Sequence, residues 1–529
     1  MMIKFINKLE KSTSNLFLAL IVIRCIDSLL INTFFDPDEY WQSLEVAHKM
    51  VFGYGEMTWE WKEMIRSYLH PLLFAIPFKI LSILNLDTTT MIIVTPKLLQ
   101  GFLSAIGDLY LYKLSCLVFN RDVAKWALIS QLISWYTFVC IVRTYSNSIE
   151  TILFIVSLYY WPIADKSREN QMSSKPVLSI ILTTIAFLIR PTTAIMWLYL
   201  IPSYIITLYR NNISIASIIQ RLFKLVMVSI IVIILNVGVD YYFYGKLTFV
   251  PYNFLYFNVT LGVSKFYGTH PFHWYFTQGL PTIAFTSILF FVLAYRDLYK
   301  DNRNDKLSLA NMTIFSVALY SVLAHKEFRF IFPILPIIMM YSGFYLNQLF
   351  PSTKSMKSDR TPKQHYSNRY KKFVVFLLLL NIPMIVFFSN FHQRSPIDIM
   401  HYINSNINTQ PNSTASIHFL MSCHATPLQS YVHNPNIHLK LLQCPPPLRP
   451  EDPKDEKSVF FENPLKWMID NYQFSDNYKA PLELPDYFIV RDDLVLELEP
   501  VLLQNNYSVE HVFKRLIDIT SSTLYKRIK

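Results

Sequence analysis

Long apolar runs follow one another from about residue 15 to residue 390, and they limit the possible folds more than any other feature of the sequence. A bilayer span needs roughly 18 to 20 apolar residues, and several runs reach that length. Only 16% of the residues are charged, whereas soluble domains carry about 25%. We therefore expect an all-α polytopic membrane protein. The apolar runs cover residues 15–35, 71–86, 91–119, 126–142, 151–163, 177–209, 222–244, 280–295, 309–324, 330–350 and 372–390. The run 177–209 is expected to break at Arg190-Pro191, so it could be one kinked span or two.

The amino terminus carries the features of a signal anchor. Lys4, Lys8 and Lys11 precede the first apolar run, which Arg24 and Asp27 interrupt. No cleavage site of small residues follows, so we expect the segment to stay uncleaved, with its amino terminus in the cytosol. The two interrupting charges are three residues apart, and they could pair or face a cavity.

The net charge of +11 fits the positive-inside rule. Basic residues are spread through the loops between spans, which argues against nucleic acid as a partner. A basic segment at 354–372 is expected to be cytosolic. The loops 36–69 and 245–279, the turn at His325 and residues 391–529 then share the opposite, luminal side.

Residues 391–529 contain no further expected span. Turn signals alternate there with short apolar stretches such as residues 487–490, which predicts a small luminal α/β domain. Residues 1–390 form the expected multi-span catalytic domain, with a luminal loop at 36–69.

Cysteines and sequons agree with a luminal carboxyl-terminal part. Cys423 and Cys444 could form a disulfide in an oxidising lumen, and Asn412 and Asn506 each begin a glycosylation sequon. No spacing of cysteine and histidine resembles a zinc site. The other cysteines fall in apolar runs, where we expect buried free thiols: Cys25, Cys116 and Cys140.

Three acids, Asp36, Asp38 and Glu39, directly follow the first span, around Pro37. Charges at the edge of a span indicate a functional site, because they are costly there unless they face water or a protein cavity. The alternative is helix capping, with Asp36 or Asp38 at the N-cap and Pro37 and Glu39 in the first turn. Local features leave both interpretations open.

The next stretch, residues 40–68, is too charged to cross a membrane and is rich in aromatic residues. We expect interfacial helices that form a lid-like platform beside the acids, with Gly53 and Gly55 at the turn between them. Three histidines are expected to be interfacial polar residues rather than metal ligands: His48, His70 and His270.

A second charged cluster lies between two later spans, at residues 325–329. Lys326 and Arg329 could hold a phosphate at the bilayer surface, with Glu327 orienting one of them. The alternative is an ordinary charged turn.

Further polar interruptions occur inside apolar runs. Asn147 and Glu150 share a helix face and could line a cavity or pair with Arg143. Arg190 must find a partner, for which an anionic lipid head is one candidate. A structural ion pair with another span is the expected role of Lys97 and Asp108.

Aromatic and amide side chains alternate in the loop 252–279, including Asn253, Tyr267, Trp274 and Gln278. Such a mixture suits a surface that stacks on sugar rings and hydrogen-bonds hydroxyls. An interfacial aromatic belt explains it equally well.

Several of these motifs together resemble glycosyltransferase family 22. They are Pro37-Asp38-Glu39-Tyr40-Trp41-Gln42 with Glu45 and His48, Thr58-Trp59-Glu60-Trp61, Arg66-Ser67, Arg143 to Glu150, Arg190-Pro191-Thr192, Asp240 to Gly245 and His325 to Arg329. The resemblance covers about the first 350 residues. It implies a GT-C-fold mannosyltransferase of the endoplasmic reticulum membrane that uses dolichyl-phosphate-mannose.

Two stretches, Phe419 to Pro427 and Leu442 to Pro446, resemble the family's GPI mannosyltransferases. This resemblance implies transfer of the third mannose, in α1,2 linkage, onto the Man2-GlcN-PI precursor. In many family members a histidine precedes the Pro-Asp-Glu, where this chain has Asp36. Either Asp38 or Asp36 is therefore the candidate base.

A β-linked lipid-phosphate donor and an α-linked product imply inversion in a single displacement. A positioned carboxylate can then accelerate the attack of the acceptor hydroxyl by roughly 10²–10⁴-fold as a general base. We expect Asp38 in that role, with Glu39 orienting the acceptor or Asp38. The leaving phosphate needs positive charge more than a proton, so we expect neither a metal nor another cofactor. The expected substrate-binding residues are Tyr40, Trp41, Gln42, Arg66, Arg143, Asn147, Glu150, Arg190, His325, Lys326, Glu327 and Arg329.

Two other functions compete with this one. One is a mannosyltransferase of the same family that acts on dolichol-linked oligosaccharide. The other is a transporter whose buried charges line a path. Transporters usually have inverted repeats and charges at the bilayer midplane, whereas the charge clusters of this chain lie at span ends.

Overall fold

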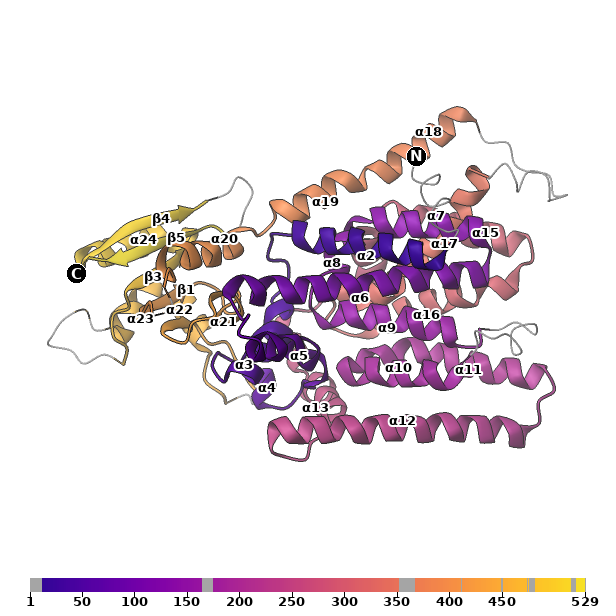
Figure 1. The fold of residues 1–529 in the computed structure, drawn as a ribbon, viewed down its shortest axis with the longest axis horizontal. Coiled ribbons are helices and arrows are strands. Elements are labelled where there is room, and N and C mark those ends of the chain that lie inside the picture. Colours follow the sequence, from indigo (N-terminus) through magenta and orange to yellow (C-terminus); the bar gives the residue numbers. More distant parts are fainter. Residues whose placement is uncertain are drawn as a thin grey trace. The chain divides into compact units, whose positions relative to one another are not determined.

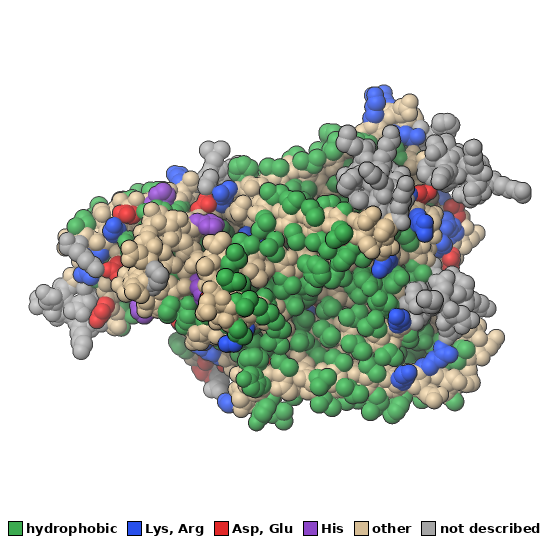
Figure 2. Space-filling model, in the orientation of Figure 1, with side chains coloured by type: hydrophobic (Ala, Val, Ile, Leu, Met, Phe, Trp, Pro, Cys, Tyr) green, Lys and Arg blue, Asp and Glu red, His purple; other side chains and the backbone are tan. Residues whose placement is uncertain are grey.

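The computed structural model describes residues 12–163, 175–351, 367–410, 412–448, 451–472, 474, 481–514 and 520–528. The expected signal-anchor lysines Lys4, Lys8 and Lys11 and most of the basic segment 354–372 lie outside these residues. Six described helices are long and apolar enough to cross a membrane, or up to eight if each of two bent helix pairs is one span. Figure 2 shows hydrophobic side chains covering most of the visible face of the helical region. The prediction of a polytopic helical membrane protein is confirmed.

The chain divides into two compact units. Unit 1 comprises residues 1–29, 64–69 and 97–385, and unit 2 comprises residues 30–63, 70–96 and 386–529. The second unit therefore contains the acidic loop as well as the carboxyl-terminal part.

Unit 1 is a bundle of helices (Figure 1). Within it, α7 packs against α17, α15 against α17, α9 against α10 and α10 against α12. Its main helices are α2 (Thr13–Leu30), α6 (Thr89–Val118, shared with unit 2), α7 (Arg121–Ile133), α8 (Trp135–Ile141), α9 (Ser146–Tyr160), α10 (Pro176–Ile189), α11 (Ala194–Arg210), α12 (Ile215–Tyr244), α13 (Val250–Leu255), α14 (Leu280–Ala284), α15 (Ser287–Lys300), α16 (Ser308–Val322), α17 (Leu335–Leu349), α18 (Asn368–Leu379) and α19 (Asn381–Asn390). Short helical turns join them: η2 (Pro191–Thr193), η3 (Tyr256–Thr260), η4 (Val263–Tyr267), η5 (Tyr275–Gly279), η6 (Asn304–Leu307) and η7 (Phe328–Ile334).

Buried charges in the bundle form ion pairs. The Arg24 guanidinium contacts Asp108 at 2.6 Å and Asp27 at 3.0 Å, and all three side chains are buried. The structural ion pair expected for Asp108 is confirmed, and its partner is Arg24. The expected break at Arg190-Pro191 is also present, between α10 and η2, because Pro191 cannot continue the hydrogen-bond ladder of α10.

Unit 2 joins short helices to a five-stranded mixed sheet (Figure 1). The strand order is β2-β1-β3-β5-β4; β1 pairs in parallel with β2 and β3, and β5 pairs antiparallel with β3 and β4. The strands are β1 (Ala415–Leu420), β2 (Ile437–Leu441), β3 (Tyr487–Arg491), β4 (Tyr507–Phe513) and β5 (Ser522–Arg527). The helices are η1 (Tyr40–Leu44), α3 (Glu45–Phe52), α4 (Trp59–Lys62), α5 (Leu69–Ile83), α20 (Ser395–Tyr402), η9 (Ile403–Ile407), α21 (Gln429–Val432), α22 (Glu456–Glu462), α23 (Pro464–Asn471) and α24 (Asp492–Gln504).

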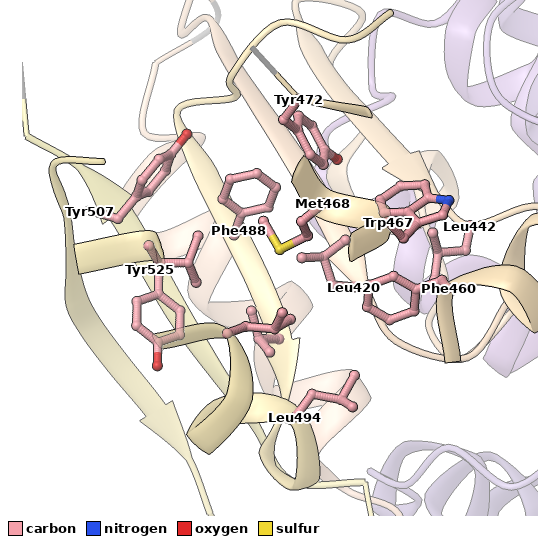
Figure 3. Close-up of a cluster of buried hydrophobic side chains, with 13 residues drawn as sticks. Leu420, Leu442, Phe460, Trp467, Met468, Tyr472, Phe488, Leu494, Tyr507 and Tyr525 are labelled. Carbon is pink, nitrogen blue, oxygen red and sulfur yellow. The ribbon is translucent and has the colours of Figure 1, made fainter. Parts of the chain in front are cut away.

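An aromatic core holds this sheet to its helices (Figure 3). Phe460, Trp467 and Tyr472 from the α22–α23 region meet Phe488 of β3 and Tyr507 of β4. Buried leucines recur every fourth residue along α24, at positions 494, 498 and 502, and give that helix its apolar face. The predicted small α/β domain is confirmed.

The cysteines divide largely as expected. Cys423 and Cys444 form a disulfide. Cys140 is a buried thiol, but Cys25 and Cys116 are only half-buried, so full burial was wrong for these two. Both lie on long apolar helices whose outer faces are exposed in the protein.

Candidate active site

The acidic corner, which we define as Asp36, Pro37, Asp38 and Glu39, begins a helix within unit 2. The Asp36 carboxylate accepts a hydrogen bond from the backbone N–H of Asp38 at 3.0 Å. Tyr40 and Trp41 both donate backbone N–H groups to the carbonyl of Pro37. Asp36 is thus the helix N-cap and Pro37 stands in the first turn, where its missing N–H costs nothing. The capping interpretation holds for Asp36 and places Asp38 in the first turn, at the second position after the cap.

The helix that follows the acidic corner is buried rather than interfacial. Tyr40 and Trp41 are 3% and 4% exposed. The Trp41 indole N–H donates to the carbonyl of Thr426 at 3.1 Å. We expected a platform along the membrane, and that prediction was wrong for these two side chains. Their aromatic faces are covered by the carboxyl-terminal segment of the same unit.

Glu45 anchors that segment. Its buried carboxylate accepts hydrogen bonds from the backbone N–H groups of Leu428 and Ser430 and from the Ser430 hydroxyl, at 2.7, 3.2 and 2.6 Å. Burial raises the pKa of Glu45, and these hydrogen bonds act in the opposite direction. Glu45 therefore fixes α3 to the start of α21.

The two aromatic motifs of the first loop form one local structure. The Gln42 amide donates to the Glu60 carboxylate at 3.2 Å, and the Trp61 indole N–H donates to the carbonyl of Trp41 at 3.2 Å. Gly53 ends α3 in the left-handed conformation, with φ of 82°, which fits the expected turn. Gln42 is buried, so its role in this structure is packing of the loop.

His48 is also buried, and the prediction of an interfacial position was wrong. Its Nε2 lies 2.9 Å from Nδ1 of His433, and the two rings meet edge to face. Burial, with His433 adding to it, lowers the pKa of His48 to about 3. His70 is buried as well, whereas His270 is exposed. His48 lies on the buried face of α3. The sequence alone does not show which face of this short helix is buried.

The second charged cluster belongs to unit 1. Glu327 accepts a hydrogen bond from His325 at 2.8 Å and forms an ion pair with Arg329. Burial alone would raise the pKa of Glu327, but Arg329 and His325 outweigh it and lower the value to about 2. We expected Glu327 to orient one cation, and it contacts two.

Lys326 faces away from this carboxylate. Its buried ammonium donates to the carbonyls of His270, at 2.9 Å, and Leu323. His325 reaches the carbonyl of Gly268 at 2.8 Å. The turn therefore packs on the loop 252–279. Lys326 stabilises the contact between the turn and this loop through its hydrogen bond to the His270 carbonyl.

The other polar interruptions meet this cluster. The Asn147 amide donates to the carbonyl of Arg329 at 3.0 Å, and Arg190 lies 5.7 Å from the ring of Phe330. Glu150 contacts Arg190 at 3.1 Å and accepts from Thr193 at 2.7 Å. Glu150 of α9 thus pairs with Arg190, which lies at the break between α10 and η2.

Two ion pairs, Arg190–Glu150 and Arg329–Glu327, lie in this part of unit 1, which also contains the buried cations Arg143 and Lys326. The Nε of Arg143 donates to the carbonyl of Val139 at 3.1 Å. A surplus of positive charge beside apolar helices suits an anionic ligand such as a lipid phosphate. We name these residues the cationic cluster: Arg143, Glu150, Arg190, Lys326, Glu327 and Arg329.

Arg66 lies in another part of unit 1. Its guanidinium lies 5.8 Å from the ring of Phe254, and its carbonyl accepts from the Tyr244 hydroxyl at 2.6 Å. The neighbouring Ser67 hydroxyl donates to Asp240 at 3.0 Å. Arg66 thus joins the end of α12 to the loop 252–279.

Sequence reasoning missed one functional candidate, His424. Its ring lies 4.8 Å from that of Trp41. The motif around it was noticed only as a family resemblance, because nothing in the sequence shows that residues 41 and 424 meet.

Comparison with known proteins gives a consistent result. The model of the Alg9-like mannosyltransferase family matches residues 15–433. Mannosyltransferase APTG1 of Arabidopsis thaliana is 39% identical over 505 residues, covering 94% of this chain and 88% of the relative. Human GPI alpha-1,2-mannosyltransferase 3 is 37% identical over 503 residues, covering 94% and 84%. The crystal structure of ArnT from Cupriavidus metallidurans bound to undecaprenyl phosphate is 12% identical, with a TM-score of 0.56 and 97% of each chain covered, which shows a shared fold.

Proposed function

Since this chain belongs to the Alg9-like mannosyltransferase family, we propose that it is a GPI α-1,2-mannosyltransferase. It transfers the third mannose from dolichyl-phosphate-mannose to the Man2-GlcN-PI precursor. The names of the relatives from human, cow, fish, frog and mouse support the activity and the linkage. The donor is a lipid-linked sugar phosphate, for which the cationic cluster has suitable chemistry.

The observation that supports the mechanism is that Asp36 and Asp38 have different positions in the acidic corner. One carboxylate oxygen of Asp36 accepts the hydrogen bond that caps the helix, and Asp38 lies in the first turn of that helix. In the proposed reaction Asp38 takes the proton of the acceptor hydroxyl as that oxygen bonds to the anomeric carbon. The bond from the anomeric carbon to the phosphate oxygen breaks in the same step, with inversion.

The leaving group is dolichyl phosphate, whose charge grows as the bond breaks. Arg329 stabilises it, oriented by Glu327, and His325 adds positive charge beside this pair when it is protonated. Arg143 and Arg190 contribute positive charge nearby. No metal takes part in this proposal.

Complementation tests the activity. Cells that lack the third GPI mannosyltransferase should regain surface GPI-anchored proteins when they express this chain, and their two-mannose intermediate should disappear. If the chain reaches the membrane and the intermediate persists, the proposal is wrong. A dolichol-linked oligosaccharide is then the next acceptor to test.

We also propose that the chain resides in the endoplasmic reticulum membrane with its carboxyl-terminal part in the lumen. Asn412 and Asn506 are exposed, so oligosaccharyltransferase could reach both. Treatment with endoglycosidase H should therefore increase the mobility of the protein on a gel. The triple variant Asn258→Gln/Asn412→Gln/Asn506→Gln, which also removes the sequon Asn258-Val259-Thr260 of the loop 245–279, should show no shift. A wild-type protein that does not shift while other luminal proteins do would contradict the orientation.

Donor binding should weaken as pH rises. Burial lowers the pKa of His325, but Glu327 and the Gly268 carbonyl outweigh it, so the pKa lies above its ordinary value. The imidazole is therefore charged below that pKa and loses its charge as pH rises through it. We expect the KM for the donor to rise about fivefold across that transition, and Glu327→Gln to move the rise to lower pH. A His325→Asn variant with the same pH dependence as wild type would contradict this assignment.

A further inference from the structure

His424 lies where it can act on the acidic corner, although 386 positions separate it from Asp38 in the sequence. Its ring contacts Trp41 with centroids 4.8 Å apart and planes at 52°. Trp41 lies three residues after Asp38 in the same helical turn, so both side chains lie on one face. The contact therefore brings the imidazole to the side of the helix that carries Asp38.

The backbone around His424 is held on both sides. The adjacent Cys423 is bonded to Cys444, and Thr426, two residues later, accepts the hydrogen bond from Trp41 at 3.1 Å. His424 itself has a φ of 58°, in the left-handed region that non-glycine residues rarely occupy. A disulfide and a side-chain hydrogen bond thus fix an uncommon conformation, which indicates that the position of this ring matters.

The charges around His424 define its state. Burial lowers its pKa to about 4; the carboxylate of Asp38 acts in the opposite direction and Lys457 in the same direction. The imidazole is therefore neutral at neutral pH and carries one N–H. Asp38 lies close enough for its charge to be felt by the ring. A neutral N–H beside a carboxylate stabilises its ionised form and fixes the direction of its free lone pairs.

We propose that His424 is a positioning residue for Asp38: it donates a hydrogen bond to the carboxylate and orients it toward the acceptor hydroxyl. The inference rests on the proposed role of Asp38 as the base. Under this proposal the carboxyl-terminal part of unit 2 supplies a residue that orients the catalytic base. It also supplies, from the other end of the chain, a histidine partner for the acidic corner.

The test uses full-length variants in microsomes from cells that lack the endogenous activity, with dolichyl-phosphate-mannose and the two-mannose acceptor. His424→Ala should lower kcat about 10- to 100-fold and leave the acceptor KM within about twofold, because only the orientation of the base is lost. The acid limb of the pH profile should move toward higher pH in the same variant, because a hydrogen-bond donor to the base is lost. Added imidazole should restore part of the activity.

His418→Asn provides a matched control. His418 is half-buried in the same domain and hydrogen-bonds Tyr472 at 2.8 Å, and burial likewise lowers its pKa to about 4. This variant should keep its kcat and its acid limb. If His424→Ala does not accumulate, His424→Asn, which retains an N–H donor, is measured instead and should lose less than tenfold.

The proposal is overturned if His424→Ala keeps its kcat and acid limb, or if all losses follow the amount of folded protein and imidazole restores nothing. A wild-type protein that forms no product contradicts the proposed acceptor instead. The same variants then test His424 with the dolichol-linked oligosaccharide acceptor.

Discussion

Replacing Asp38 with asparagine should reduce mannose transfer roughly 10²–10⁴-fold. Asparagine keeps the size of the side chain but cannot accept the proton of the acceptor hydroxyl, and the loss of a general base costs roughly 10²–10⁴-fold. The protein should reach normal levels, because asparagine is well tolerated near a helix start. Transfer to the two-mannose acceptor is the measurement, with membrane abundance as the check on folding.

The matched control is Asp36→Asn, which makes the same chemical change two residues earlier. Asn caps helices as well as Asp does, so the hydrogen bond to the Asp38 N–H should persist and transfer should stay within a few-fold of wild type. Asp36→Ala, which removes the cap, should cost about 1 kcal/mol of stability. The base would have to be reassigned if Asp36→Asn were as inactive as Asp38→Asn.

The second large effect is expected at Arg329. Arg329→Gln should lower kcat/KM for the donor roughly 10²–10³-fold, because a positive charge beside the leaving phosphate is lost. Arg329→Lys should recover part of the rate, since lysine keeps the charge but not the planar fork of the guanidinium. Initial rates at varied donor concentration measure both effects.

Two controls separate phosphate binding from a merely structural ion pair. Arg296→Gln removes an arginine whose side chain is half-exposed and paired with Asp297, and it should leave the kinetics unchanged. The double variant Glu327→Gln/Arg329→Gln restores charge balance within the turn. If the double variant were active while Arg329→Gln was not, Arg329 would serve only to neutralise Glu327.

The sequence predicted the elements that depend on composition and local chemistry. Apolar runs predicted the spans, Pro191 the break after Arg190, and the turn-rich tail a small α/β domain. The charged motifs were found for the same reason, because an ionisable residue among apolar ones stands out. Asn147 and Glu150 stood out for this reason, and in the structure they lie together with Arg190 and Arg329.

What the sequence did not predict depends on contacts between distant segments. Arg143 is the arginine close to Glu150 in the sequence, and only the fold shows the contact between Glu150 and Arg190. Tyr40, Trp41 and His48 have the composition of an interfacial surface. They are buried because the segment ending at His433 covers them. An amphipathic aromatic side chain has the same sequence signature whether lipid or protein covers its apolar face, so the sequence could not distinguish the two.

The bonds from Glu45 to Ser430 also set an order of events in biosynthesis. Glu45 and Ser430 are separated by 385 residues in the sequence. Ribosomes add roughly 5 to 20 residues per second, so Ser430 is synthesised on the order of 20 to 80 s after Glu45. During that time the helix of the acidic corner lacks its cover. The enzyme therefore matures late, after synthesis of nearly the whole chain, and a nascent protein that is truncated before this segment is complete retains every acidic motif yet should have no organised base.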